Sequence, residues 1–172
     1  MKKATIADLN IIRAIYWKLI DSSEKYASIL QWKKDIYPAD DDWISYINNK
    51  EMYLIYHDTE LIGAVALTKA QSEEYRKIEW TIDAGDNEVA VVHLLVVDPD
   101  YQGQGATTAT LDEIIKMAAN MNKKAVRLDA IGTNKPAQKL YEKYGFANCG
   151  KEQEYYESTG SVEFIFYEYV LK

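Results

Sequence analysis

Apolar and polar residues follow a helical period in several parts of the chain. In residues 9–22, and again around 111–119, apolar side chains recur every three to four positions, which predicts an amphipathic helix in each stretch. A third helix is predicted over 136–144, because Pro136 suits a first helical position and Gly145 suits the position just past a helix end. These three stretches form the expected helical framework.

Short apolar runs between turn residues predict the strands. Residues 52–56 and 61–67 flank His57-Asp58-Thr59-Glu60 and are typical of a hairpin. The run 89–97 is apolar at nearly every position, which favours a strand that is buried on both faces. Further strands are predicted at residues 2–7, 78–82, 125–131, 146–151 and 162–171.

Two N-terminal stretches complete the expected order of elements. Residues 23–37 fit either a second helix or a loop, whereas Pro38 and the acidic residues 40–42 favour the start of a short helix. The order mixes strands and helices and has a strand–helix–strand unit in its second half. It predicts one α/β domain over residues 1–172, with a mixed, twisted sheet of about six to seven strands and helices on both faces.

Composition and net charge limit the kinds of ligand and partner that the protein is expected to bind. The chain has 172 residues, of which 48% are hydrophobic and 27% charged, as in ordinary globular domains. A net charge of −7 and a pI of about 4.9 argue against a nucleic-acid partner and favour a cationic substrate only weakly. Cys149 is the only cysteine, so neither an internal disulfide nor a metal cluster is expected. The N-terminal lysines precede no apolar segment and no run is long enough to span a membrane, so we expect a cytoplasmic protein.

The segment after residue 97 has the pattern of an anion site. The apolar run stops at Asp98-Pro99, passes through Gln102-Gly103-Gln104-Gly105 and leads into a helical pattern. Glycines let the backbone approach a phosphate, and the first turn of a helix offers unpaired N–H groups and the positive end of the helix dipole. A dinucleotide fingerprint would need a third glycine where Thr108 stands, and no Gly-Lys-Ser/Thr follows to make a P-loop. A phosphate-bearing ligand is therefore predicted here.

Three local patterns in order resemble the GNAT superfamily of acetyl-CoA-dependent N-acetyltransferases. The first is the glycine turn, the second is Arg127-Leu128-Asp129 on a predicted strand, and the third is a spaced set near the C-terminus. The spaced set is Asn134, Ala137, Tyr141, Gly145 and Phe146. The resemblance covers about residues 89–150, and only Thr107 departs from it, because the family has Gly or Ala at that position.

The resemblance implies how acetyl-CoA would bind. In this family the pyrophosphate lies on the backbone N–H groups of the turn, and the pantetheine arm pairs with the preceding strand, while an asparagine contacts the arm from the other side. The residues that would bind acetyl-CoA are Leu95, Val97, Gln102, Gly103, Gln104, Gly105, Ala106, Thr107, Asn134 and Ala137. The branched side chain of Thr107 would narrow the approach, although its hydroxyl offers a hydrogen bond. No metal is implied.

The resemblance also implies catalytic roles. Tyr141 matches the family's general acid, which protonates the departing thiolate, although its helical stripe also fits a core tyrosine. His93 lies where some members carry a general base, although a lone histidine in an apolar strand also fits the core. The alternative bases are Glu79, Asp83 and Glu88, or ordered water.

The predicted function is transfer of an acetyl group from acetyl-CoA to a primary amine: a small amine, an amino acid or a peptide amine. Both substrates would bind together, and the amine would attack the thioester directly. The alternatives are a non-catalytic acyl-CoA-binding sensor and a dinucleotide-binding oxidoreductase. Residues 69–77 and the N-terminal helices would determine the acceptor. Homodimers are common in the family, but the sequence itself requires none.

Overall fold

The computed structural model describes residues 1–157 and 160–172. The chain divides into two compact units. Unit 1 comprises residues 1–67 and 93–113, and unit 2 comprises residues 68–92 and 114–172. Strand β4 and helix α4 each contribute residues to both units.

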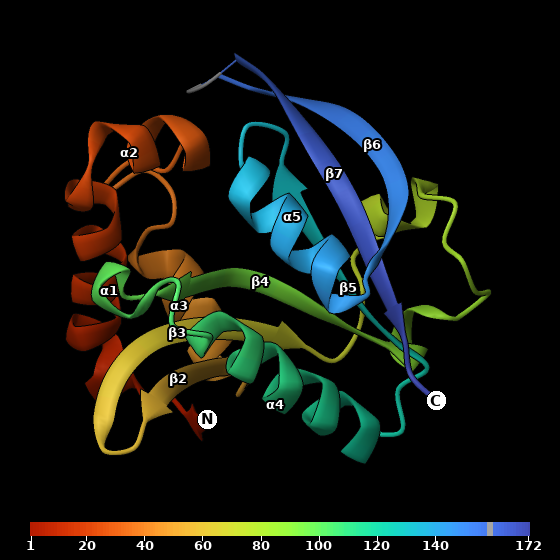
Figure 1. The fold of residues 1–172 in the computed structure, drawn as a ribbon, viewed down its shortest axis with the longest axis horizontal. Coiled ribbons are helices and arrows are strands. Elements are labelled where there is room, and N and C mark those ends of the chain that lie inside the picture. The colour runs from red at the N-terminus through yellow and green to blue at the C-terminus, as the bar shows by residue number, and fades with distance from the viewer. Residues whose placement is uncertain (158–159) are drawn as a thin grey trace. The chain divides into compact units, whose positions relative to one another are not determined.

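Strands and helices follow one another in mixed order (Figure 1). The helices are α1 (Leu9–Ser22), α2 (Glu24–Leu30), α3 (Asp40–Asn48), α4 (Ala106–Asn120) and α5 (Lys135–Tyr144). The strands are β1 (Lys2–Lys3), β2 (Met52–His57), β3 (Glu60–Thr68), β4 (Val89–Val97), β5 (Ala125–Ile131), β6 (Ala147–Tyr156) and β7 (Gly160–Val170). The strands form a seven-stranded sheet in the order β1-β2-β3-β4-β5-β7-β6. The β4–β5 pair is parallel, while β1–β2, β2–β3, β5–β7 and β6–β7 are antiparallel, so the predicted mixed sheet is confirmed.

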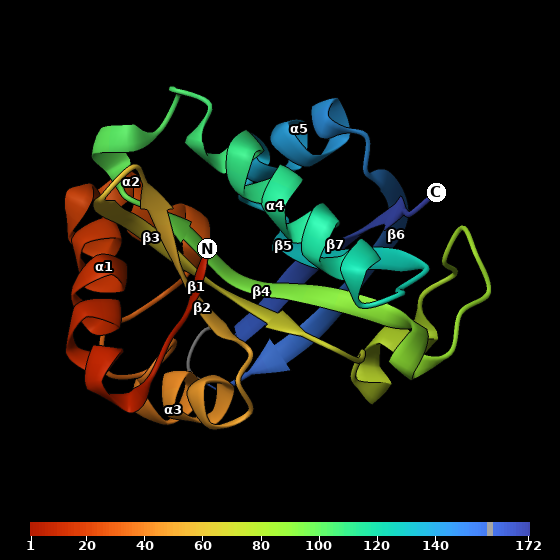
Figure 2. The ribbon, with the colours of Figure 1, turned by 90° about the horizontal axis from the view of Figure 1, so that it is seen from below.

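In unit 1, helices α1 and α3 pack on the strands through one apolar cluster (Figure 2). The periodicity of 9–22 explains this, because it places the buried residues of α1 on one stripe. The cluster contains Ala4, Ile12, Tyr16, Leu19, Trp43, Ile47, Met52, Leu54, Ala64, Ala66, Leu94 and Val96. Each large side chain buried in such a cluster contributes about 1.5–3 kcal/mol to folding.

The first predicted strand, 2–7, is too long. Only Lys2–Lys3 pairs with β2, and Ile6–Asp8 forms a 3-10 turn. The physical reason is local, because the Asp8 carboxylate accepts hydrogen bonds of 2.8 Å from both the backbone N–H and the hydroxyl of Thr5. These bonds turn the chain directly into α1. Residues 23–37, whose sequence fits either a helix or a loop, contain the short helix α2.

In unit 2, helix α5 packs on β7 through aromatic rings (Figure 1). The ring of Tyr141 lies 5.8 Å from that of Tyr167, and Tyr144 lies 5.7 Å from Tyr169. Strand β6 is longer than the predicted 146–151 and is the last strand of the sheet. Most of its side chains are exposed on both faces, which fits an edge strand whose acidic residues face solvent.

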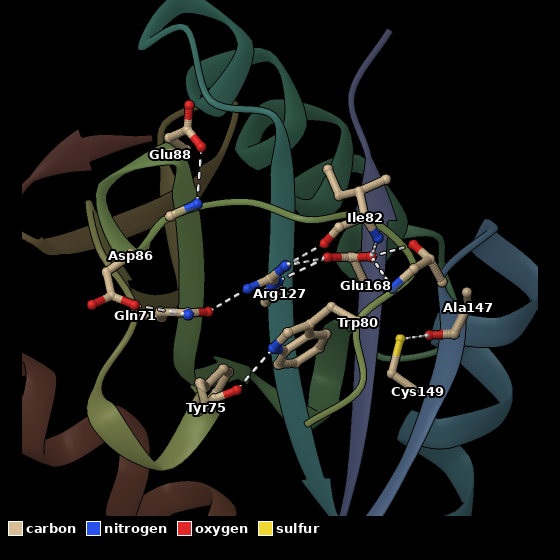
Figure 3. Close-up of polar contacts among 12 residues, drawn as sticks. Gln71, Tyr75, Trp80, Ile82, Asp86, Glu88, Arg127, Ala147, Cys149 and Glu168 are labelled. Carbon is tan, nitrogen blue, oxygen red and sulfur yellow. Dashed lines mark hydrogen bonds and ion pairs between the residues drawn. The ribbon is translucent and has the colours of Figure 1, made fainter. Parts of the chain in front are cut away.

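The predicted strand 78–82 is wrong. This segment is an irregular loop whose backbone groups are bound by side chains rather than by a neighbouring strand (Figure 3). The carboxylate of Glu168 accepts the N–H groups of Thr81 at 2.9 Å and Ile82 at 3.3 Å, and Arg127 donates to the carbonyl of Ile82 at 3.3 Å. The apolar residues that suggested a strand instead pack on the core of unit 2, because Ile78 and Trp80 contact the cluster around Phe166.

A buried ion pair organises this loop. Arg127 and Glu168 have almost no exposed surface, and the Nε and Nη2 atoms of Arg127 both lie 2.8 Å from Oε1 of Glu168. The guanidinium also stacks 4.2 Å from the Trp80 ring centroid and donates a hydrogen bond to the side chain of Gln71 (Figure 3). These contacts tether the 69–88 segment to β5 and β7.

Candidate functional site

The turn after β4 has the backbone shape that an anion cradle needs. Asp98 accepts the N–H of Asp100 at 3.0 Å and so fixes a 3-10 turn at Pro99–Tyr101. Gly103 and Gly105 then adopt φ values of +74° and +85°, which L-residues with a Cβ rarely adopt. In the described part of the chain, no heavy atom lies within 4 Å of a Cβ built on either glycine, so the space over the turn is open.

Helix α4 begins directly after this turn. The carbonyl of Gly105 accepts the N–H of Ala109 at 3.0 Å, which makes Gly105 the residue at which the helix starts. The N–H groups of Ala106, Thr107 and Thr108 therefore belong to the first turn, where a helix supplies no acceptor of its own. Together with the positive end of the dipole, they suit a phosphate oxygen. Thr107 is half-buried at this helix start.

Gln102 has a structural role in the turn. Its side chain donates to the carbonyl of Val97 at 3.1 Å and accepts a hydrogen bond from the hydroxyl of Tyr26. Its backbone N–H donates to Pro99 at 3.2 Å. Gln102 therefore holds the turn against the end of β4.

Acidic residues next to the turn are balanced by a lysine of α1. The Nζ atom of Lys18 lies 2.7 Å from a carboxylate oxygen of Asp98 and 2.7 Å from one of Asp100. The hydrogen bond to Asp100, followed by that to Asp98, raises the pKa of Lys18, so its charge persists across the neutral range. This cation reduces the repulsion that the two carboxylates would exert on a bound phosphate.

Strand β4 carries a bulge at Leu94. Its φ of +52° is left-handed, which is unusual for a leucine and interrupts the regular strand. The hydroxyl of Tyr16, a fully buried residue of α1, donates a hydrogen bond to the Leu94 carbonyl. Leu94 and Val96 pack in the unit 1 core, whereas His93 and Leu95 are half-buried. A bulge changes the direction in which the backbone N–H and carbonyl groups on either side of it point.

Replacing Tyr16 with phenylalanine tests what holds this bulge. The buried carbonyl of Leu94 would lose its donor, so we expect the free energy of unfolding to fall by about 1–3 kcal/mol. Urea denaturation measures the change. Tyr53→Phe is the control, because Tyr53 is also a buried tyrosine of unit 1, although it lies on β2 rather than on a helix. An equal fall in the free energy of unfolding in both variants would mean that the hydrogen bond to Leu94 adds no stability beyond that of another buried tyrosine hydroxyl.

His93 lies in unit 1 and stacks on Tyr46 of α3, with ring centroids 5.9 Å apart and an interplanar angle of 24°. Of the alternative bases, Glu79 and Asp83 are exposed loop residues. The Glu88 carboxylate accepts the N–H of Gly85 at 2.9 Å and lies 2.7 Å from Lys124. The hydrogen bond from Lys124 lowers the pKa of Glu88, which makes it a weaker proton acceptor.

In unit 2, Tyr141 is largely buried on α5, with 8% of its surface exposed. Burial is the main cause that raises the pKa of its hydroxyl, and the negative charge of Asp129 and then the neighbouring Tyr167 add to the effect. A raised pKa keeps the phenol protonated at neutral pH, and it also makes the phenol a weaker proton donor than an exposed tyrosine.

Asn134 and Ala137 form the N-terminal cap of α5. The Asn134 side chain accepts the N–H of Ala137 at 3.3 Å, and Pro136 occupies the first turn. At the other end, Gly145 adopts the predicted left-handed conformation with φ +116°. The spacing from Asn134 to Gly145 therefore corresponds to the length of α5, because these two residues cap the two ends of the helix that carries Tyr141.

The sequence-predicted residues fall into two groups. Unit 1 holds His93, Leu95, Val97 and the turn 102–107, while unit 2 holds Asn134, Ala137 and Tyr141. Sequence reasoning missed a further pair in unit 2, in which the Tyr75 hydroxyl donates a hydrogen bond to the Asp129 carboxylate. Asp129 lies inside a pattern already noted on β5, but nothing in the sequence marks Tyr75 as its partner.

Within the described ranges, 1–157 and 160–172, no group of three or more His, Cys, Asp or Glu side chains is arranged to hold a metal ion. None of the helices in the same ranges is both long and apolar enough to cross a bilayer. Cys149 is half-buried, and burial is the main cause that raises the pKa of its thiol, which keeps the thiol from acting as a nucleophile at neutral pH.

Comparison with known proteins assigns the family. The model of the acetyltransferase (GNAT) family matches residues 13–146, which is most of the chain. The chain belongs to the GNAT acetyltransferase family. The match includes β4, the glycine turn and the whole of α5, so the sequence-based resemblance is confirmed. The structure supplies the turn and the capped helix that the resemblance led us to expect.

Individual relatives agree with this assignment. An uncharacterized N-acetyltransferase of Methanocaldococcus jannaschii is 34% identical over 67 residues, which is 39% of this chain and 30% of that protein. The chain thus matches about a third or less of the length of its curated relatives. A GNAT-family acetyltransferase structure from Streptococcus agalactiae has a TM-score of 0.81 at 18% identity, covering 99% of this chain and 94% of that one. An acetyltransferase structure from Salmonella typhimurium with its cofactor acetyl-CoA has a TM-score of 0.67 at 16% identity, covering 99% and 92%.

Proposed function

We propose that this protein transfers an acetyl group from acetyl-CoA to a primary amine. The turn at Gly103–Gly105 carries the proposal, since it joins two left-handed glycines, with open space at their Cβ positions in the described residues, to the start of a helix. Family membership supports the choice of an acyl-CoA among phosphate-bearing ligands. In this proposal the N–H groups after Gln102 bind the pyrophosphate, and the backbone of Leu95 and Val97 pairs with the pantetheine arm.

In this proposal, different residues of the chain carry out the successive steps of acetyl transfer. The amine loses a proton to His93 or to water, and its lone pair forms a bond to the thioester carbonyl carbon. A backbone N–H near the Leu94 bulge stabilises the negative charge that develops on the carbonyl oxygen. As the carbon–sulfur bond breaks, Tyr141 gives its proton to the sulfur. The position of Tyr141 within the residues that the family model matches supports this assignment.

A ligand-stabilisation experiment tests the proposal. Acetyl-CoA present at about 100 times its dissociation constant should stabilise the protein by about 2.7 kcal/mol, seen as a higher melting temperature. A nicotinamide dinucleotide at the same concentration should have little effect. Equal or greater stabilisation by the dinucleotide would contradict the proposal. Stabilisation by acetyl-CoA without acetyl transfer to any amine would identify a binding module instead.

The glycine turn gives a specific prediction. Gly105→Ala should weaken acetyl-CoA binding about tenfold, because a Cβ enters the open space and alanine disfavours a φ of +85°. Isothermal titration calorimetry measures the affinity. Gly150→Ala is a matched control, since Gly150 has a φ of +110° and the same open surroundings, but lies on β6. An unchanged affinity in the Gly105 variant would exclude this turn as the phosphate cradle.

A further inference from the structure

The side chain of Gln102 connects the glycine turn, residues 102–105, to helix α2. Its amide oxygen accepts a hydrogen bond from the Tyr26 hydroxyl, and its amide nitrogen donates to the Val97 carbonyl at 3.1 Å. Tyr26 lies on α2 and Val97 ends β4, and all three residues belong to unit 1. Since an amide has an acceptor on one side and a donor on the other, the two bonds fix the direction in which the Gln102 side chain points.

Tyr26 is itself held in place by its surroundings. Its backbone N–H donates to the carbonyl oxygen of Ser23 at 3.0 Å and to the hydroxyl oxygen of Ser23 at 3.2 Å. Its partly buried ring packs against the apolar cluster of unit 1, which contains Tyr16 and Trp43. A tyrosine placed in this way buries its ring and offers its hydroxyl to a polar partner. The core of unit 1 therefore determines where the Tyr26 hydroxyl lies.

The glycine turn depends on contacts made by its neighbours. Gly103 and Gly105 adopt φ values of +74° and +85°, and glycine loses more backbone freedom on being fixed than any other residue. The side chain of Gln104 donates to the Asp100 carbonyl at 2.8 Å, so this bond is made close to the turn itself. Gln102, in contrast, bonds to both α2 and β4 immediately before the first glycine. It is therefore the position at which other elements of unit 1 restrain the turn.

Restraint of the turn before binding affects its affinity for an anion. When the backbone N–H groups already have the arrangement that a ligand needs, binding does not cost the free energy of ordering them. The bond from Tyr26 limits rotation of the Gln102 side chain, and Gln102 adjoins the first glycine. Without the hydroxyl the turn can still form, but the unliganded protein populates more conformations of it.

We propose that Tyr26 is a positioning residue for acetyl-CoA binding. Its hydroxyl holds Gln102, and Gln102 holds the glycine turn in the shape that receives the pyrophosphate. This inference rests on the proposed function and adds to it a residue that lies 76 positions from Gln102 in the sequence. Tyr26 acts on the turn rather than on the groups assigned to the thioester, so it affects the binding of acetyl-CoA and not the bond-forming step.

Tyr26→Phe tests the inference, because it removes the hydroxyl and keeps the ring against the core of unit 1. We expect the Kd of acetyl-CoA, measured by isothermal titration calorimetry, to rise about fivefold. KM for acetyl-CoA should rise to a similar extent, while kcat stays within about twofold of the native value. Tyr53→Phe removes a tyrosine hydroxyl from β2 of the same unit and should leave Kd within about twofold of native.

A double-variant cycle tests whether the effect passes through Gln102. Gln102→Leu removes both amide bonds and should itself weaken acetyl-CoA binding. When Tyr26→Phe is added to Gln102→Leu, Kd should change by less than about twofold, because the hydroxyl no longer has an amide to hold. A structural role of Tyr26 that is independent of Gln102 would instead raise Kd equally in both backgrounds.

Four results would overturn the inference. They are an equal rise in Kd from Tyr26→Phe in both backgrounds, a rise below about twofold in the native background, an unchanged Kd in Gln102→Leu, and a rise in Tyr53→Phe as large as that in Tyr26→Phe. Each of them leaves acetyl transfer by the native protein intact. If the native protein binds no acetyl-CoA, the proposed function fails, and this inference fails with it.

Discussion

Tyr141→Phe should lower turnover by about 10²–10⁴-fold and leave acetyl-CoA binding within about twofold of the native value. The expected loss is in kcat, because the phenol acts only when the carbon–sulfur bond breaks. Phenylalanine keeps the ring that packs against Phe146 and Tyr167, so the substitution should leave the fold intact. Steady-state kinetics and calorimetry on the same preparation measure both quantities.

Tyr144→Phe is the matched control for this variant. Tyr144 lies on the same helix and packs its ring against Phe146 and Tyr169, so the substitution removes a hydroxyl without touching the proposed acid. It should keep kcat within about twofold of native. Full activity in Tyr141→Phe would show that another group, or water, protonates the sulfur.

Arg127→Met should lower the free energy of unfolding by about 3–5 kcal/mol. The substitution leaves the Glu168 carboxylate buried without its cation, and it also removes the stacking on Trp80. The 69–88 segment should then lose its tether to β5 and become accessible to protease (Figure 3). Urea denaturation and limited proteolysis measure the two effects.

Lys151→Met provides the comparison at the surface. Lys151 and Glu163 lie 2.7 Å apart, close to the 2.8 Å of the buried pair, but both are more exposed, so the free energy of unfolding should fall by less than about 1 kcal/mol. In the double variant Arg127→Met/Glu168→Gln the unpaired charge is gone. The fall in its free energy of unfolding should therefore be smaller than the sum of the falls in the two single variants. If the free energy of unfolding falls by less than about 1 kcal/mol in Arg127→Met alone, the buried ion pair does not have the stabilising role assigned to it.

The fold was predictable wherever local chemistry and periodicity agreed. Residues 9–22 became α1 with the predicted bounds, and α5 runs from its asparagine cap to Gly145 as its sequence indicates. The segment 78–82 failed because its backbone groups bind Glu168 and Arg127, which are far away in sequence. A contact of that kind leaves no periodic signal in the segment itself.

The site was predictable only where backbone shape depends on residue type. Glycines at 103 and 105 predicted a turn that brings the backbone close to a ligand, and both have a positive φ. Leu94 gave no such signal, because leucine disfavours this conformation and a hydrogen bond from Tyr16 supports it. The pairing of Tyr75 with Asp129 joins residues 54 positions apart, so only the folded chain reveals it.

The most direct test of acetyl transfer is one measurement of both products. The protein is incubated with acetyl-CoA and a panel of primary amines, while free thiol and acetylated amine are quantified together by mass spectrometry. Our account predicts that the two appear in equal amounts and only when an amine is present. Binding of acetyl-CoA with no acetylated amine from any member of the panel would contradict it.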